Sequence, residues 1–235
     1  LASTRRQYDV IVSEPSNPWI TGVSDLFTVD HWRITKQRLR PGGIYCQWVQ
    51  LYELSPGNIK TIYRTFASQF EHVLVLSADD RSSDTVMLGS DQPIRLDLAR
   101  VQQAFAPVEC QDEDPADHCY CERSADSGEL LNATCPSEIA IELERANVYT
   151  PFDIFARTLL ATRDEVMAYT MIEERRREGG YEAVPASHNA SRCEEPECRR
   201  RPAVLNTDDN AHIEFNAPRD LIGFSRYERY LSTVY

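Results

Sequence analysis

Hydrophobic residues first cluster in the segment from Tyr8 to Val12, where four of the five positions are apolar. A short apolar run that contains β-branched residues and is closed by turn formers is typical of a parallel strand covered on both faces. The run leads into Glu14 and a loop that contains Pro15 and Pro18. Because ligands of open α/β sheets bind just beyond the carboxyl ends of the strands, Glu14 is a candidate for chemistry. A loop carboxylate that caps the next helix is the alternative.

Alternating helical and strand patterns follow. A helix is predicted from Ser24, as its N-cap, to Leu39, with Pro41-Gly42-Gly43 as the stop. Residues 43–51 are predicted to form a strand, in which Cys46 is expected to be a small buried hydrophobe. The residues expected to share one face of this strand are Ile44, Cys46 and Trp48.

The next elements complete the order strand, helix, strand, helix, strand, strand. Ser55-Pro56 opens an amphipathic helix. Its apolar positions at helical spacing are Ile59, Ile62, Tyr63, Phe66 and Phe70. Residues 72–76 and 85–88 are predicted to be two strands joined by the polar turn 78–84, as a hairpin-like pair at the sheet edge.

The pattern changes after a short helix predicted at 97–105. An acidic, cysteine-containing insertion is expected at 107–146, and two helices are expected to pack as a hairpin at 147–180. Thr150-Pro151 starts the first of these helices, and a capping box at Thr162 to Glu165 starts the second. A second loop spans 181–203, and residues 204–235 are expected to return to the domain formed by residues 1–106. The run Arg199-Arg200-Arg201 in that loop is interpreted as a solvated face.

Composition narrows the classes of protein that the chain can belong to. With 235 residues, of which 42% are hydrophobic, the chain can bury a sizeable core. The formal net charge of -12 argues against nucleic-acid binding and favours cationic ligands. No window has the length and apolarity of a membrane span, and no signal peptide opens the chain.

Six of the seven cysteines lie in the two expected insertions. One interpretation is a set of three disulfides, in an oxidising compartment. Another is a structural zinc site built from four of the cysteines and His118 or His188, although the Cys-x-Cys spacing at 119–121 is a poor match. Unpaired thiols are the third. The cysteines concerned are Cys110, Cys119, Cys121, Cys135, Cys193 and Cys198.

Several motifs together resemble a known family. The segment Asp9-Val-Ile-Val-Ser-Glu-Pro-Ser-Asn-Pro18 with Leu26-Phe27 is similar to the motif that follows the fourth strand in aminopropyltransferases of the spermidine synthase type. The resemblance is closer to a bacterial branch in which such a domain is often fused behind a membrane transporter. It extends through Pro41 to Trp48 and Leu88-Gly-Ser90, and resumes at Leu205 to Asn210 with Glu214-Phe215.

This resemblance implies an α/β fold, namely the second half of a class I methyltransferase-like (Rossmann-like) sheet whose last strand is antiparallel to its neighbours. The glycine-bearing turn and acidic strand end that bind a nucleoside in such sheets are not found near Leu1. The chain is therefore expected to be the carboxyl-terminal part of a longer protein, without the half that binds the donor.

The resemblance also implies the chemistry and the site. Decarboxylated S-adenosylmethionine would donate an aminopropyl group to a di- or polyamine, without a metal. Glu14 takes the position of the family's catalytic aspartate, and Asn17 that of the second motif aspartate, so the first keeps the charge and the second loses it. Tyr52 and Glu53 would help to hold the amine, and Asp208 and Asp209 would bind its second ammonium, with an Asx-type turn as the alternative for that pair.

Two other functions remain open at this point. The chain is either such a transferase, or a non-catalytic domain that binds or senses polyamines for an attached transporter, or an S-adenosylmethionine-dependent methyltransferase. The resemblance to the transporter-fused branch implies a cytoplasmic domain, which would be anchored to the membrane in a fused full-length protein. Such a domain could also form oligomers.

Overall fold

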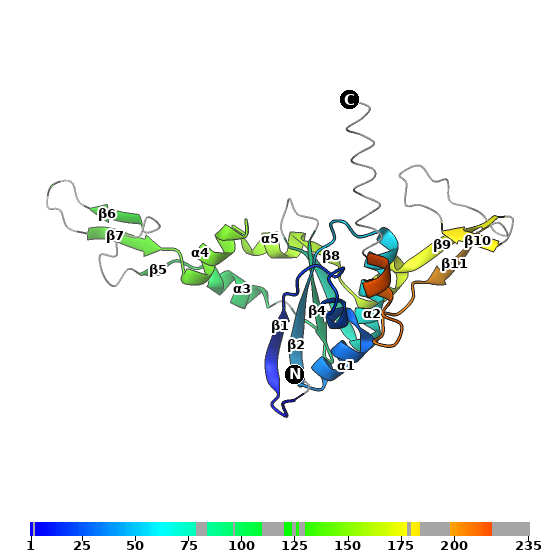
Figure 1. The fold of residues 1–235 in the computed structure, drawn as a ribbon. Helices are drawn as coiled ribbons and strands as arrows, with labels where there is room; N and C mark the ends of the chain where they lie inside the picture. The colour runs from blue at the N-terminus through cyan, green and yellow to red at the C-terminus, as the bar shows by residue number, and fades with distance from the viewer. Residues whose placement is uncertain are drawn as a thin grey trace. The chain divides into compact units, whose positions relative to one another are not determined.

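The computed structural model describes residues 1, 3–78, 84–95, 97–109, 120–123, 126, 130–177, 180–183 and 198–217. The chain divides into two compact units. Unit 1 comprises residues 1–78, 82–94 and 159–235, and unit 2 comprises residues 79–81 and 95–158. Figure 1 gives the element labels used below.

A five-stranded sheet with the order β1-β2-β4-β3-β8 forms the centre of unit 1. Strand β1 runs parallel to β2, whereas β4 is antiparallel to both β2 and β3. The predicted antiparallel last strand is therefore confirmed, and it lies between β2 and β3. The strands of this sheet are β1 (Tyr8–Ser13), β2 (Leu39–Val49), β3 (His72–Ser77), β4 (Thr85–Ser90) and β8 (Thr158–Leu160).

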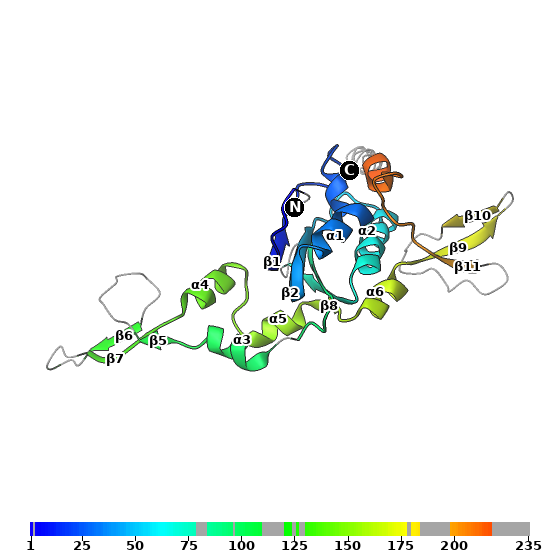
Figure 2. The same ribbon diagram turned by 90° about the horizontal axis from the view of Figure 1, so that it is seen from below.

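Helices α1 and α2 lie together on one side of this sheet (Figures 1 and 2). The remaining helices of unit 1 are a 3-10 helix, η1, between β1 and α1, the helix α6 after β8, and a helical turn at 212–217. Their bounds are η1 Ser24–Phe27, α1 Val29–Lys36, α2 Pro56–Gln69 and α6 Arg163–Tyr169. As predicted, Ser55 caps α2 by accepting a hydrogen bond from the backbone N–H of Asn58, with Pro56 in the first turn.

The prediction of one continuous helix from Ser24 to Leu39 is wrong. It consists of η1 and α1, separated by Thr28 in an extended conformation. Thr28, not Ser24, is the N-cap of α1, because its side chain accepts the backbone N–H of His31 at 3.1 Å. The break is a tertiary effect, since the backbone N–H of Val29 donates to the carbonyl of Asn206, far along the chain.

Strand β1 is not covered on both faces, contrary to the prediction. It is the edge strand of its sheet, and Val10 and Val12 are 57% and 68% exposed. The run of apolar residues correctly indicates a strand, but burial depends on neighbours that periodicity does not report.

Burial within β2 also differs from the expectation. Cys46 shares a face with Ile44 and Trp48, but all three are half-buried, whereas the opposite face is fully buried through Tyr45, Gln47 and Val49. Cys46 is a free thiol whose pKa is raised by burial, which lowers the fraction of the reactive thiolate.

The core of unit 1 is an aromatic cluster between the sheet and the helices. Trp32 of α1 packs edge-to-face on Phe66 of α2 with ring centroids 5.1 Å apart, and Tyr45 of β2 stacks on Phe70 at 5.9 Å. Gln47 is the polar member of this cluster. Its Oε1 accepts from the Tyr45 hydroxyl at 2.6 Å and from the Trp32 indole N–H at 3.3 Å, so a fully buried amide is satisfied.

The predicted helical hairpin at 147–180 is wrong. Helix α5 (Pro151–Ala156) and α6 are separated by β8, and the segment after Tyr169 is β9 (Met171–Arg177). Strand β9 lies between β10 (Gly180–Ala183) and β11 (Cys198–Pro202) in an antiparallel three-stranded sheet.

Charge pairing joins β9 and β11. Arg199 and Arg200 are exposed, as predicted for a solvated face, and the side chains of all three arginines also pair with carboxylates of β9. The Nε atoms of Arg199 and Arg201 lie 2.8 Å and 2.5 Å from the carboxylate of Glu174, which is buried, and Arg200 pairs with Glu173. The Arg201 hydrogen bond, with help from Arg199, holds the pKa of Glu174 below its usual range.

Unit 2 contains the first expected insertion, and it has more regular structure than the sequence suggested. A three-stranded sheet with the order β5-β7-β6 accompanies three short helices. The predicted helix at 97–105 is confirmed as α3, with Asp97 as its N-cap. The elements are α3 (Leu98–Ala104), β5 (Val108–Glu109), β6 (Tyr120–Arg123), β7 (Leu130–Cys135), α4 (Glu138–Arg145) and α5.

For two of the six insertion cysteines, the structure gives the bonding state of the sulfur atom. Cys135 at the end of β7 and Cys198 at the start of β11 are each disulfide-bonded, as one of the three interpretations predicted. Cys110, Cys119 and Cys193 lie outside the described residues. Disulfides persist mainly in oxidising compartments, which is in tension with the cytoplasmic location expected from the resemblance. Along the described stretches, no helix is long and apolar enough to cross a membrane.

Packing around Gly89 of β4 predicts a specific loss of stability. A Cβ atom there would lie 2.5 Å from Phe70 Cγ and 2.9 Å from Phe66 Cζ, so Gly89→Ala should lower the free energy of unfolding by about 1–3 kcal/mol in urea denaturation. Gly57→Ala in α2 is the control, because the nearest atom to its Cβ is 3.8 Å away and alanine favours helix by roughly 0.5–1 kcal/mol. Equal stability of the two variants would contradict the packing.

Differential alkylation should distinguish the cysteines. Without reductant, Cys135 and Cys198 should resist alkylation of the unfolded chain, whereas Cys46 should be labelled in full and serves as the internal control. Mass spectrometry of the peptides gives the result. Labelling of Cys135 or Cys198 to the extent of Cys46 would contradict the assigned disulfides.

Candidate functional site

The parallel pairing of β1 and β2 brings two predicted parts of the site to one edge of the sheet. Ser13, the last residue of β1, pairs with Gln47, two residues before the end of β2. Glu14 therefore leaves the sheet beside Trp48, and the turn that contains Tyr52 and Glu53 follows β2 at the same edge. Glu14 is exposed, so its carboxylate is accessible to a ligand.

The loops after β1 and β2 contact each other directly. The hydroxyl of Tyr52 donates to Oδ1 of Asn17 at 3.3 Å, and the rings of Tyr52 and Trp19 meet edge-to-face with centroids 5.7 Å apart. The buried ring of Pro18 and a turn from Ile20 N–H to the Asn17 carbonyl fix the first loop. The structure thus joins Asn17 and Tyr52 by a hydrogen bond.

Glu53 occupies an uncommon backbone conformation. Its φ of 60° lies in the left-handed region, which few residues other than glycine adopt. The turn from Leu51 to Leu54 closes around it, with a hydrogen bond from Leu54 N–H to the Leu51 carbonyl. Backbone strain of this kind clusters at functional sites, and here it sets the position of a carboxylate beside Tyr52.

Asp208 and Asp209 lie in a separate part of unit 1. Both are exposed, in a turn that is fixed by Asn210, whose Oδ1 accepts the backbone N–H groups of Thr207 and His212. The predicted Asx-type turn is therefore confirmed. Within the described ranges, no hydrogen bond or ion pair joins either aspartate to Glu14, Asn17, Tyr52 or Glu53.

Asn206, which the sequence analysis did not single out, anchors this turn. It is fully buried, its side chain donates to the Phe27 carbonyl and accepts from Ile213 N–H, and its backbone N–H donates to Thr65 Oγ1. These bonds tie the 205–217 segment to η1 and α2. An asparagine among polar residues gives no signal of such burial in the sequence.

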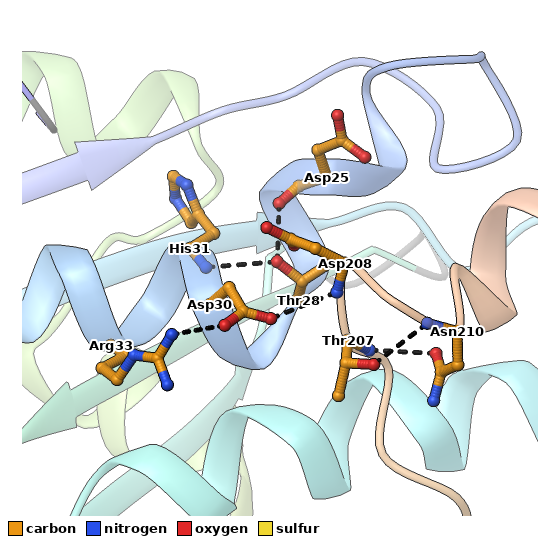
Figure 3. Close-up of polar contacts among 8 residues, drawn as sticks. All are labelled: Asp25, Thr28, Asp30, His31, Arg33, Thr207, Asp208 and Asn210. Atoms are coloured by element: carbon orange, nitrogen blue, oxygen red, sulfur yellow. Dashed lines mark hydrogen bonds and ion pairs between the residues drawn. The ribbon is translucent and has the colours of Figure 1, made fainter.

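A second group of carboxylates lies at the start of α1. The backbone N–H of Asp208 donates to Oδ2 of Asp30 at 3.2 Å, and Asp30 also pairs with Arg33 (Figure 3). Asp25 belongs to the preceding 3-10 helix, and its carbonyl accepts the hydroxyl of Thr28. Among the described residues, no three His, Cys, Asp or Glu side chains are grouped so as to hold a metal ion.

His31 connects this group to the core, and the sequence analysis also missed it. Its Nε2 lies 3.3 Å from the hydroxyl of Tyr45, which in turn donates to Gln47. Burial raises the pKa of Tyr45 to about 12, so this phenol stays protonated at neutral pH. Burial lowers the pKa of His31, and the charge of Asp208 opposes that effect.

Comparisons with known proteins were made for the whole chain. No protein-family model matches it, and no curated protein matches it. Among solved structures, it is similar to a probable spermidine synthase from Corynebacterium glutamicum, with a TM-score of 0.34 and 16% sequence identity. The match covers 62% of this chain and 48% of the length of that structure.

The pKa of His31 tests the placement of Asp208. In wild-type protein, an NMR titration should give a His31 pKa below the ordinary 6.5, because burial disfavours the imidazolium. Asp208→Asn should lower it further, since a nearby negative charge that favours the imidazolium is removed. Asp209→Asn is the matched control. A rise in the His31 pKa in Asp208→Asn, or a shift no larger than in the control, would contradict the arrangement.

Proposed function

We propose that the complete protein transfers an aminopropyl group from decarboxylated S-adenosylmethionine to a di- or polyamine, and that this chain supplies the side of the site that receives the amine. The observation that carries the proposal is the meeting of the β1 and β2 loops, in which Tyr52 donates to Asn17. Glu14 and Glu53 belong to the same two loops.

The topology of unit 1 supports the same function. The order β1-β2-β4-β3, with β4 antiparallel to its neighbours, is the one expected for the second half of a class I methyltransferase-like sheet. In such sheets the ligand lies beyond the carboxyl ends of the parallel strands. Glu14, Tyr52 and Glu53 follow those ends, so the proposed amine site occupies the expected edge.

The reaction requires a base more than any other group. An alkylammonium with a pKa near ~10 must lose a proton before its nitrogen can attack, which costs about 4 kcal/mol at neutral pH. Glu14 accepts that proton. The nitrogen then forms a bond to the aminopropyl carbon next to the sulfonium, the carbon–sulfur bond breaks, and its electron pair stays on sulfur, so the sulfonium leaves as a neutral thioether.

The aromatic and acidic groups suit a cationic substrate before the proton is lost. Tyr52 is 43% exposed, and its ring contacts the ring of Trp19. An alkyl chain or an ammonium packs favourably against such aromatic rings. Glu53 follows Tyr52 in the chain and adds a second negative charge to this pair of loops. Asp208 and Asp209 are proposed to attract the distal ammonium of a longer polyamine rather than to contact the reacting nitrogen.

A polyamine-binding domain without catalysis is the second candidate, and the chemistry of Asn17 favours it. The position that the resemblance assigns to a second aspartate carries a neutral amide, and its oxygen already accepts the Tyr52 hydroxyl. Such a domain would bind the amine at the same edge but would transfer nothing to it. Binding of a diamine by the complete protein, without consumption of the donor, would select this function.

Removal of the charge of Glu14 tests catalysis. In the complete protein, Glu14→Gln should reduce turnover by ~10²-fold or more while the fold persists, because the amide cannot accept the ammonium proton. Glu71→Gln provides the control, since Glu71 precedes β3, and the structure reports only a 3.9 Å contact from its carboxylate to Lys36. Unchanged turnover in Glu14→Gln would remove Glu14 from the mechanism.

A further inference from the structure

The helices of unit 2 leave large apolar side chains uncovered. Ile139 of α4 is 57% exposed, and Phe152 of α5 is 68% exposed. In the described part of the chain, α3, α4 and α5 bury no residue, and Val148 is the only buried hydrophobic residue between 97 and 158. Contiguous apolar surface marks interaction sites in soluble proteins, so the arrangement of these residues matters. The other exposed large apolar residues of unit 2 are Leu98, Val108 and Tyr149.

These helices are too short to be stable without burial. Helices α3, α4 and α5 have seven, eight and six residues. Isolated helices shorter than roughly 12 residues are marginal in water, and most helical stability in proteins comes from packing of an apolar face. Asp97 and Ser137 cap the amino ends of α3 and α4, but the described residues of unit 2 provide little apolar burial. A partner that covers the apolar face would provide it.

Helix α4 presents an apolar strip with acidic residues on both sides. Ile139 and Leu143 are one turn apart and lie on the same side of the helix. At 3.6 residues per turn, Glu138 and Glu142 follow one side of this strip, and Glu144 lies on the other. All three glutamates are exposed, and Leu143 is half-buried. The strip therefore has an apolar centre and a negatively charged rim.

Helices α4 and α5 are fixed to each other at their carboxyl ends. A guanidinium N–H of Arg157, which follows α5, donates to the carbonyl of Ala146 at 2.8 Å and to that of Asn147 at 3.3 Å. The N–H of Val148 donates to the Leu143 carbonyl, and Asn147 has a φ of 57°, as in a Schellman motif. The apolar surface is thus carried by a preformed pair of helices, which lowers the ordering cost of binding.

The charge of unit 2 selects the kind of partner. Residues 95–158 hold 13 acidic and five basic side chains, a formal net charge of -8 within the -12 of the whole chain. Glu142 pairs with Arg145, whereas no ion pair within the described residues engages Glu138 or Glu144. A second copy would bring the same excess of negative charge, and nucleic acids and anionic lipid surfaces are also negative. Charge complementarity therefore favours a partner that is both apolar and basic.

We propose that the surface formed by α4 and α5 docks a basic amphipathic helix of another protein. The apolar side of that helix packs along the row of Ile139 and Leu143, as ridges of i and i+4 side chains do in helix pairs. Lysine or arginine residues beside its apolar side meet Glu138 and Glu144. This inference goes beyond the proposed function, because it uses neither the β1 loop nor the β2 loop.

Fluorescence anisotropy of a labelled amphipathic peptide, LKKLLKLLKKLLKL, tests the surface in the full chain. Ile139→Ser should weaken binding about 10-fold or more, since it removes an apolar side chain that the peptide covers. Val12→Ser is its control, because Val12 is an exposed apolar residue of β1 in unit 1, and this variant should bind as wild type does.

A second pair of variants tests the acidic rim. Glu138→Gln with Glu144→Gln should weaken binding several-fold and reduce its dependence on salt, because two negative charges next to the strip are removed. Asp25→Asn with Glu71→Gln removes two exposed charges of unit 1 and should leave binding unchanged. If Ile139→Ser lowers the Tm, the comparison of these two charge variants decides the result.

Four outcomes would overturn the inference. The first is no binding of the peptide by wild type, and the second is equal binding of the acidic peptide LEELLELLEELLEL, which would show apolar contact without charge selection. The third is an equal loss of affinity in each variant and its control. The fourth is a dimer of the chain without peptide, by sedimentation, that Ile139→Ser abolishes, because a second copy would then cover the surface. None of these outcomes bears on the proposed function, which is measured with donor and diamine.

Discussion

The parallel pairing of β1 with β2 is the constraint on which the rest of the site depends. Because the two strands run in the same direction, their carboxyl ends meet at one edge, and the loops that follow them can touch. The register that pairs Ser13 with Gln47 then determines which residues leave the sheet together. A slip of one residue would turn every side chain of β1 to the opposite face.

Buried hydrogen bonds of two amide side chains connect the elements packed around this sheet. Gln47 ties β2 to α1 through the indole of Trp32, and Asn206 ties the 205–217 segment to η1 and α2. Each amide is fully buried, so loss of one partner would leave an unsatisfied group in the core. The loops above this base are more exposed, and the Tyr52–Asn17 contact is the hydrogen bond that connects them. A rigid base below adaptable loops is a common arrangement for binding sites.

The carboxylates of the chain divide into groups with different surroundings. Glu174 is enclosed by Arg199 and Arg201, so its charge is neutralised and it stabilises the β9–β11 pair. Asp30 is engaged by Arg33 and by the backbone of Asp208. Glu14, in contrast, is exposed at the strand edge. This difference in surroundings separates Glu14, the proposed base, from the carboxylates that hold the fold.

The sequence predicted the elements whose signals are local. The Ser55-Pro56 start of α2, the Asp97 cap of α3 and the strands β3 and β4 all follow from capping chemistry and periodicity, which act within a few residues. The roles of Glu14, Asn17 and Tyr52 in an amine site stay predictions from the resemblance, and the structure adds a hydrogen bond between Tyr52 and Asn17.

Only the tertiary structure decided features that depend on distant partners. The charged run after Tyr169 has the spacing of a helix, but pairing of Glu173 and Glu174 with arginines of β11 makes it a strand. Similarly, the Asn206 carbonyl binds Val29 where α1 begins, and Val10 and Val12 of the edge strand β1 are exposed in the described part of the chain. The burial of Gln47 also required the fold, because a glutamine gives the same signal in the sequence whether it lies in the core or at the surface.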